Sequence, residues 1–404
     1  MSNVFELAAD VIPEHNNAVI KVVGVGGGGT NAVQHMVNSQ LPGVDFICAN
    51  TDSQALQKMT APVRLQLGKT VTKGLGAGAN AEIGRQAAIE DRDTIRAVLE
   101  GADMVFITAG MGGGTGTGGA PVVAEIAREM GILTVGVVTK PFRFEGNKRM
   151  EAAESGIKAL AEKVDSLIII PNNRLLEVLG KVTLVEAFAA ANNVLLGAVR
   201  GIADVILRHG LINVDFADVR TVMSERGMAL MGTGTAVGED RARMATELAI
   251  SSPLLDNVCL QGARGVLVSI AANSDLGIDE YHTVGSIVSD LAHEDAVVKI
   301  GTILDSSMGD EILVTVVATG LSETAAKGAQ AHISQPTLVP PMMAAAVASG
   351  MRQGAAVPDY THFDAPAIGR RPAGGVRNAT AAQPKRNKEV NYMEIPAFLR
   401  RQAD

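Results

Sequence analysis

Two glycine-rich loops constrain the fold of this chain most strongly, because each follows a continuous apolar strand and precedes a helix. The first loop, residues 24–29 (GVGGGG), follows the apolar run 19–25. The second, residues 112–118 (GGGTGTG), follows the run 102–110, and the next helix is predicted to start near Pro121. Continuous apolar strands that alternate with helices predict an α/β fold, in which helices cover both faces of a parallel sheet.

The same alternation continues between and after the two loops. Further apolar strands are predicted at 44–52, 132–142 and 165–172, and helices at 81–101 and 148–164. These strands are apolar at consecutive positions, whereas a strand exposed on one side would alternate apolar and polar residues. We therefore expect one sheet that is buried on both faces and that carries the two glycine loops.

A single long helix is predicted at 183–209, with Gly210 as its C-terminal cap. We interpret it as a strut between two domains, because shorter strands and helices follow it to about residue 320. The chain then changes composition: seven of its fifteen prolines fall in 321–390, without sustained periodicity, which predicts a disordered tether. The predicted divisions are an N-terminal extension, a ligand-binding α/β domain, the central helix, a smaller α+β domain, the tether and a terminal recognition peptide, at residues 1–17, 18–182, 183–210, 211–320, 321–390 and 391–404.

Composition and charge exclude several classes of protein. The net charge is −8, and because residues 321–390 carry +4 and the last stretch balances, the first 320 residues carry −12. An acidic body argues against nucleic-acid binding. Cys48 and Cys259 lie in apolar runs without metal-ligand spacing, which predicts buried free thiols in a reducing cytoplasm. No uninterrupted run of 18 apolar residues occurs, so we expect no membrane insertion.

The first loop has two interpretations that its residues leave open. Residues 24–29 match the GxGxxG pattern of dinucleotide-binding folds, and Asp52 ends the next strand, where a ribose-binding acid is expected. A nicotinamide-dependent oxidoreductase is therefore one hypothesis. It gives no use to the second loop.

The second loop indicates a ligand with several phosphates. Consecutive glycines at 112–118 allow phosphate oxygens to reach backbone N–H groups, and the following helix N-terminus adds positive potential. Thr115 and Thr117 can donate further hydrogen bonds. Two such loops on one sheet predict a nucleoside polyphosphate gripped from both sides.

Two carboxylates follow the long helix. Asp215 and Asp218 lie three residues apart at the start of a predicted helix, so both can point the same way. Capping of that helix is one explanation, and catalysis is the other. Their spacing alone leaves both open.

The run GGGTGTG at 112–118 is highly specific, and it resembles the hallmark of the tubulin/FtsZ family, of proteobacterial type. Other stretches that resemble this family are VVGVGGGGTNAV, NTD, TKGLGAGAN, KPFRFEG, NVDFADVR and the terminal IPAFLRRQAD. The likeness spans residues 18–320 and the final peptide. It implies a tubulin-like fold, with a GTP-binding domain joined by the central helix to the smaller domain. It also implies a GTPase, with GTP or GDP and Mg²⁺ as ligands, that assembles head to tail into a division ring.

The resemblance assigns the nucleotide contacts. Glu145 and Arg149 correspond to contacts on the ribose side, although an exposed i,i+4 ion pair explains them equally well. Phe188 corresponds to the residue that stacks on guanine, and Asn193 to the one that hydrogen-bonds it, where Asp is usual. The phosphate contacts are assigned to Gly27, Gly28, Gly29, Thr30, Asn31, Gly112, Gly113, Gly114, Thr115, Gly116, Thr117 and Gly118.

The resemblance also assigns catalysis and partners. Asp215 and Asp218 of one subunit, assisted by Asn213, are implied to orient water at the γ-phosphate bound by the next subunit. Residues 391–401 resemble the peptide that binds membrane-tethering proteins of the FtsA and ZipA type, and assembly regulators of the MinC type are implied. The expected location is the cytoplasm, at mid-cell under the inner membrane. A scaffold that binds nucleotide without hydrolysing it is the remaining alternative.

Overall fold

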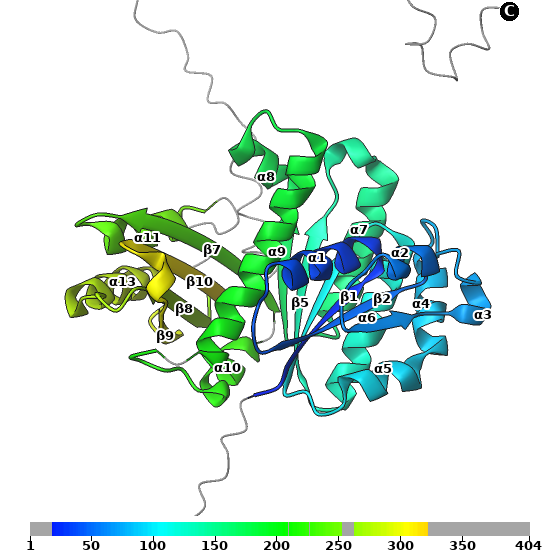
Figure 1. Ribbon diagram of the computed structural model, residues 1–404, viewed down its shortest axis with the longest axis horizontal. Coiled ribbons are helices and arrows are strands. Elements are labelled where there is room, and N and C mark those ends of the chain that lie inside the picture. The colour runs from blue at the N-terminus through cyan, green and yellow to red at the C-terminus, as the bar shows by residue number, and fades with distance from the viewer. Residues whose placement is uncertain (1–17, 209, 226, 253–261, 322–404) are drawn as a thin grey trace, which may run out of the picture. The chain divides into compact units, whose positions relative to one another are not determined.

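The computed structural model describes residues 18–208, 210–225, 227–252 and 262–321. Their strands form a ten-stranded sheet in the order β3-β2-β1-β4-β5-β6-β7-β10-β8-β9 (Figure 1). The strands are β1 Ile20–Val25, β2 Val44–Asn50, β3 Val63–Gln66, β4 Met104–Gly110, β5 Leu133–Lys140, β6 Ser166–Pro171, β7 Gly227–Val237, β8 Gly265–Ala272, β9 Val297–Leu304 and β10 Glu311–Leu321. The helices are α1 Gly26–Asn38, α2 Ser53–Gln57, α3 Lys69–Thr72, α4 Ala81–Glu90, α5 Arg92–Leu99, α6 Gly114–Glu129, α7 Asn147–Ala161, α8 Asn172–Leu179, α9 Leu184–Leu207, α10 Phe216–Met223, α11 Arg241–Ile250 and α13 Ile278–Leu291, with 3₁₀ turns η1 Arg143–Glu145 and η2 Ser306–Met308.

Strands β3 to β6 form the parallel half of the sheet. Alternate residues of β1 enter opposite cores: Val22 packs with α1 and α9, whereas Val23 packs with α4 to α7. This is why the strands are apolar at every position rather than at every second one. The predicted α/β fold with helices on both faces is confirmed.

The second half of the sheet continues from the first without a break. β6 pairs in parallel with β7, at Ser166 to Gly227 and the next two positions. Beyond it, β10 is antiparallel to both β7 and β8, and β9 is parallel to β8. A third apolar core lies under α11 and α13. The smaller α+β part therefore shares a sheet with the larger one.

The central helix α9 crosses between the two halves (Figure 1). Thr183 caps its N-terminus in a capping box with Glu186. α9 is long and apolar enough to cross a membrane by composition alone, but Leu195, Val199 and other residues along it are buried in the main core. It is a core helix of a folded domain.

The predicted cap at Gly210 is wrong. α9 ends at Leu207, and Arg208, in extended conformation, is its C-cap. Gly210 has a different reason to be glycine, because a Cβ there would overlap the carbonyl oxygen of Thr302 in β9. It permits a close approach of two backbones rather than a helix stop.

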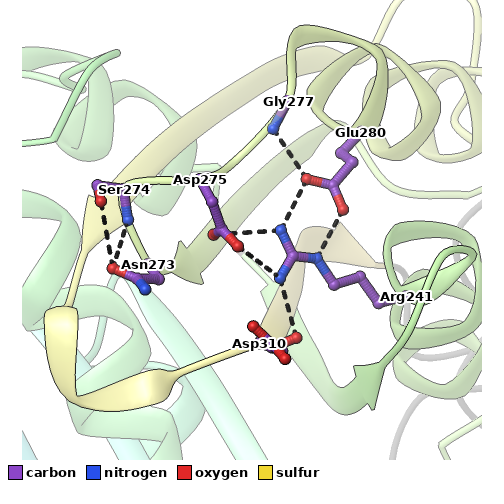
Figure 2. A network of polar contacts seen from close by, with 7 residues as sticks. All are labelled: Arg241, Asn273, Ser274, Asp275, Gly277, Glu280 and Asp310. Atoms are coloured by element: carbon purple, nitrogen blue, oxygen red, sulfur yellow. Dashed lines mark hydrogen bonds and ion pairs between the residues drawn. The ribbon is translucent and has the colours of Figure 1, made fainter.

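A buried arginine at the start of α11 contacts α13, the loop before α13 and the loop before β10 (Figure 2). Arg241 donates from Nε to Glu280 Oε1 at 2.6 Å and from Nη2 to Glu280 Oε2 at 3.0 Å. It also contacts Asp275 and donates to the carbonyl oxygen of Asp310 at 2.9 Å. We refer to these four residues as the Arg241 clamp.

Several predictions lie outside the described residues. These are the N-terminal extension, the tether beyond residue 321, the terminal peptide and Cys259. Cys48 is described, and it is a fully buried free thiol in β2. Burial raises its pKa to about 11.

Candidate nucleotide-binding site

The first glycine run lies inside a helix rather than in a loop before it. α1 begins at Gly26, directly after β1, and no side chain caps it. Gly26 has φ +72°. A Cβ on Gly28 would come within 2.9 Å of Gly110, whereas one on Gly27 would meet nothing within 4 Å. The first turn thus offers uncapped N–H groups beside an open space, which is the arrangement that binds phosphate.

The second glycine run also forms a helix N-terminus, and α6 begins at Gly114 instead of near Pro121. The glycines allow this because Gly118 packs so closely that a Cβ would overlap the carbonyl oxygen of Ala81. Gly113, the N-cap residue, has open space around its Cβ position. The run therefore serves two purposes: close packing on α4 and an uncapped helix end.

The threonine hydroxyls of the two runs are used within the protein. Thr30 donates to the carbonyl oxygen of Gly26, and Thr115 shares a 2.6 Å hydrogen bond with Thr51. Thr117 Oγ1 accepts from the N–H of Gly112 at 2.8 Å. The structure thus gives these side chains a role in holding the runs in shape.

A cavity of about 320 Å³ opens beside the first turns of α1 and the end of β4, and no residue of the second glycine run, 112–118, is among its lining residues. This volume is within the range of small-molecule sites. Of the residues predicted from the sequence, it brings together Gly28, Asn31, Glu145, Arg149 and Phe188. The remaining described lining residues are Gly110, Met111, Thr139, Pro141, Asn172, Ala191, Asn192 and Leu195.

Charged groups flank one side of this cavity. Glu145 Oε2 contacts Arg149 Nε at 3.1 Å, and Glu145 Oε1 accepts from the N–H of Phe142 at 2.9 Å. The predicted i,i+4 ion pair is therefore present. Arg149 is half exposed, so its outer guanidinium nitrogens can still meet an anion in the cavity.

Phe188, which lines the cavity, belongs to a cluster of three phenylalanines. Phe142 is fully buried and stacks on Phe144, with ring centroids 4.9 Å apart. Phe188 meets Phe142 edge-on at 5.3 Å and is 42% exposed. One face of Phe188 is thus available to a planar group in the cavity.

Asn193 lies outside the cavity. Its Oδ1 contacts His35 Nε2 at 2.6 Å, while its neighbour Asn192 lines the cavity. The resemblance assigned Asn193 alone, and a residue's orientation on a helix depends on packing that the sequence does not show.

Asn172 is a site residue that sequence analysis missed. It is 4% exposed, lines the cavity, and its Oδ1 has no hydrogen-bond partner among the described residues. A buried amide oxygen without a partner is costly unless a ligand supplies a donor. The position of Asn172 directly after β6 could have indicated it, because ligands of parallel sheets bind at the ends of the strands.

Asp52, the residue proposed for the ribose of a dinucleotide, caps a helix. Its Oδ1 accepts from the N–H groups of Gln54 and Ala55 at the start of α2. This cap gives Asp52 a structural role that does not require a ribose ligand.

The acidic residues lie at the opposite end of α9. Asp215 caps α10, with its Oδ1 accepting from the N–H of Asp218 at 2.7 Å. Asn213 Oδ1 accepts from the N–H of Gly210 at 2.7 Å. The carboxylate of Asp218 contacts Lys299 Nζ at 2.7 Å. We call Asn213, Asp215 and Asp218 the acidic end.

The acidic end and the cavity are too far apart to meet within one chain. Phe188 and Asn192 lie in the first half of α9, whereas Asp215 follows its last residue. From Leu195, the last cavity residue on α9, to Leu207 the helix rises about 18 Å, at about 1.5 Å per residue. Among the described residues, no three His, Cys, Asp or Glu side chains converge as a metal site.

A sheet whose parallel half carries two glycine-rich helix ends, the first of them bordering a cavity, and whose second half lies beyond a long helix, defines a nucleotide-binding protein of two coupled halves. Residues 19–180 match the model of the Tubulin/FtsZ family, GTPase domain, and residues 227–322 match the FtsZ family, C-terminal domain. The chain belongs to the Tubulin/FtsZ family, and its larger part is a GTPase domain of that family. The predicted family, fold and enzyme class are confirmed.

Relatives at high identity span the whole chain. It is 58% identical to the cell division protein FtsZ of Pseudomonas aeruginosa, over 99% of this chain and all of that one. It is also 58% identical to the cell division protein FtsZ of Coxiella burnetii, over 95% and 96% of the two chains. Among solved structures, an empty FtsZ dimer of M. jannaschii is 42% identical, with a TM-score of 0.73 over 76% of this chain and 89% of that one.

Proposed function

We propose that this protein hydrolyses GTP between the subunits of a head-to-tail filament that forms the division ring. The observation that carries this proposal is the separation of the cavity from the acidic end by the second half of α9. Unlike surfaces at opposite ends of a subunit join heterologously, and such contacts make filaments when the rotation does not close a ring. The similarity to cell division proteins agrees with it.

The cavity residues hold the nucleotide in the following way. The N–H groups of α1 and α6 bind the phosphates, with Gly27 and Gly113 leaving room for the oxygens. Phe188 stacks on the base. The partnerless Oδ1 of Asn172 and the amide of Asn192 take the hydrogen bonds of guanine, so Asn192 replaces Asn193 in this proposal. Guanine suits this pair because its N1–H and exocyclic amine are donors.

The acidic end supplies the catalytic groups to the next subunit. Asp215 and Asp218 orient a water molecule for attack on the γ-phosphorus, while the bond to the β–γ bridging oxygen breaks to give GDP and phosphate. Asn213 assists in positioning. Mg²⁺, when bound with the nucleotide, would neutralise charge on the phosphates.

Phosphate release measured against protein concentration tests this proposal. The rate per subunit should be near zero at low concentration and rise where light scattering reports filaments, with GTP but not with ATP. Asp218→Ala should bind GTP normally and assemble, yet lose hydrolysis. A rate per subunit that is independent of concentration would refute the shared site.

The proposal also includes the partners and the location of the protein, which involve residues outside those that the structure describes. Residues 391–401 bind membrane-tethering proteins of the FtsA and ZipA type, and MinC-type proteins regulate assembly, in the cytoplasm at mid-cell under the inner membrane. Deletion of 391–404 should leave GTP hydrolysis intact and abolish recruitment to adaptor-bearing vesicles. Recruitment that survives the deletion would place the adaptor site elsewhere.

A further inference from the structure

Lys299 contacts the acidic end from a neighbouring strand. It lies in β9, beside Leu267 of β8, and α10 packs across both strands. Its Nζ is 2.7 Å from Oδ1 of Asp218, and the two side chains are 35% and 36% exposed. A lysine in this place extends its apolar stem along a half-buried strand and its ammonium to the rim.

The contact leaves half of the Asp218 carboxylate available. Oδ1 is held by Lys299, while Oδ2 has no partner within the part of the chain that the structure describes. Asp215 also presents one oxygen, because its Oδ1 already accepts from the N–H of Asp218. Each carboxylate is thus anchored by one oxygen and can accept a proton of water with the other.

Lys299 also changes the charge that the acidic end carries. Asp215 and Asp218 together bring two negative charges, and a bound triphosphate is itself strongly negative. Like charges brought together across an interface oppose association. The ammonium of Lys299 offsets one of the two charges without occupying the free oxygens.

We infer that Lys299 is a positioning residue for hydrolysis: it fixes the orientation of Asp218 and offsets its charge, so that the acidic end can approach the phosphates of the next subunit. This inference rests on the proposed function, in which Asp218 acts on a neighbour's nucleotide. It gives a role to Lys299, which the sequence analysis did not name as a site residue.

Lys299→Met in the full chain tests the inference. Turnover per assembled subunit should fall about fivefold, which is the most that a part-exposed ion pair contributes, and more protein should be needed for assembly. GTP affinity of the isolated subunit should stay within about twofold of the parent, because Lys299 is remote from the cavity. Lys299→Arg should retain at least half of the turnover, since it preserves the ion pair.

Lys163→Met is the matched control. Lys163 pairs with Glu125 at 3.2 Å, with side-chain exposures of 38% and 41%, and no residue of the acidic end takes part in this pair. It should leave turnover unchanged. If Lys299→Met does not fold, the turnover of Lys299→Gln is compared with that of Lys299→Arg instead.

The outcomes distinguish a failure of this inference from a failure of the proposed function. If Asp218→Asn keeps full turnover in filaments, the proposed function fails. If Asp218→Asn loses turnover while Lys299→Met and Lys163→Met both keep it, Lys299 has no positioning role and the proposed function stands.

Raising the salt concentration should narrow the difference in assembly between Lys299→Met and the parent, because screening weakens charge repulsion. A difference that salt does not change would contradict the charge argument.

Discussion

Replacing Arg241 by Met should destabilise the second half of the sheet far more than replacing Arg243. Both residues lie on α11, two positions apart, and each pairs with two carboxylates. They differ in burial: the Arg241 side chain is 8% exposed and its main partner Glu280 16%, whereas Arg243 and its partners are all about half exposed.

The magnitude follows from that difference. Loss of one member of a buried ion pair costs about 3–5 kcal/mol, since it leaves the other charge without a partner. Glu280 retains some exposure and Asp275 is 49% exposed, so we expect about 3 kcal/mol for Arg241→Met. Arg243→Met should cost no more than about 1 kcal/mol, as for exposed pairs. Met preserves the apolar stem in both variants.

Thermal unfolding followed by circular dichroism measures the comparison. Arg241→Met should lower the melting temperature by roughly 6–10 °C and Arg243→Met by about 2 °C or less. Arg241→Lys should fall in between, because an ammonium keeps the charge but loses the bidentate contact with Glu280. Equal shifts for Arg241→Met and Arg243→Met would refute the argument from burial.

The pH dependence of this effect has a definite sign. The hydrogen bond from Arg241 lowers the pKa of Glu280 below its usual range. A lowered pKa gives stability that is present above the unfolded pKa and lost as pH falls through the folded value. The gap between the parent and Arg241→Met should therefore be full at pH 7 and shrink in acid.

Further predictions concern the cavity and the free thiol. Gly27→Ala should keep the parent's melting temperature and weaken GTP binding at least tenfold, whereas Gly118→Ala should lower the melting temperature, because its Cβ would overlap Ala81 while that of Gly27 meets open space. Asn192→Ala should weaken GTP binding by roughly 1–2 kcal/mol in equilibrium titration, and Asn193→Ala should change it by less than about 0.5 kcal/mol; the reverse order would restore the original assignment. With the second cysteine of the chain replaced by serine, Cys48 should resist alkylation at pH 8 for hours and react at once in denaturant, because its pKa is raised to about 11 by burial.

Local pattern predicted much of the fold. The shorter strands and helices predicted after the long helix, to about residue 320, are present in the structure from α10 to β10. The parallel half was predicted from its continuous apolar runs, each of which is buried on both faces.

The differences arise where distant contacts override local pattern. The helix predicted at 81–101 is broken at Asp91, whose Oδ2 accepts from the N–H of Gly68 at 2.6 Å. α6 starts earlier than predicted, because its glycines pack on α4. Neither contact can be read from nearby residues.

The candidate site was predicted in part. Gly28, Asn31, Glu145, Arg149 and Phe188 do line one cavity, and the motifs that contain them indicated as much. Sequence analysis assigned Asn193 and did not name Asn192 or Asn172, and which asparagines line the cavity depends on side-chain directions. Those directions are set by packing against α1 and β6, which the sequence does not encode locally.

The length of α9 has a consequence for the ends of a filament. If each complete site needs the cavity of one subunit and the acidic end of another, a filament has one fewer complete site than it has subunits. One terminal subunit always has an open cavity that no neighbour covers, and it keeps its nucleotide intact. The opposite terminus presents carboxylates with nothing to act on. The two tips therefore differ chemically, so growth and loss of subunits have a direction that is built into each monomer.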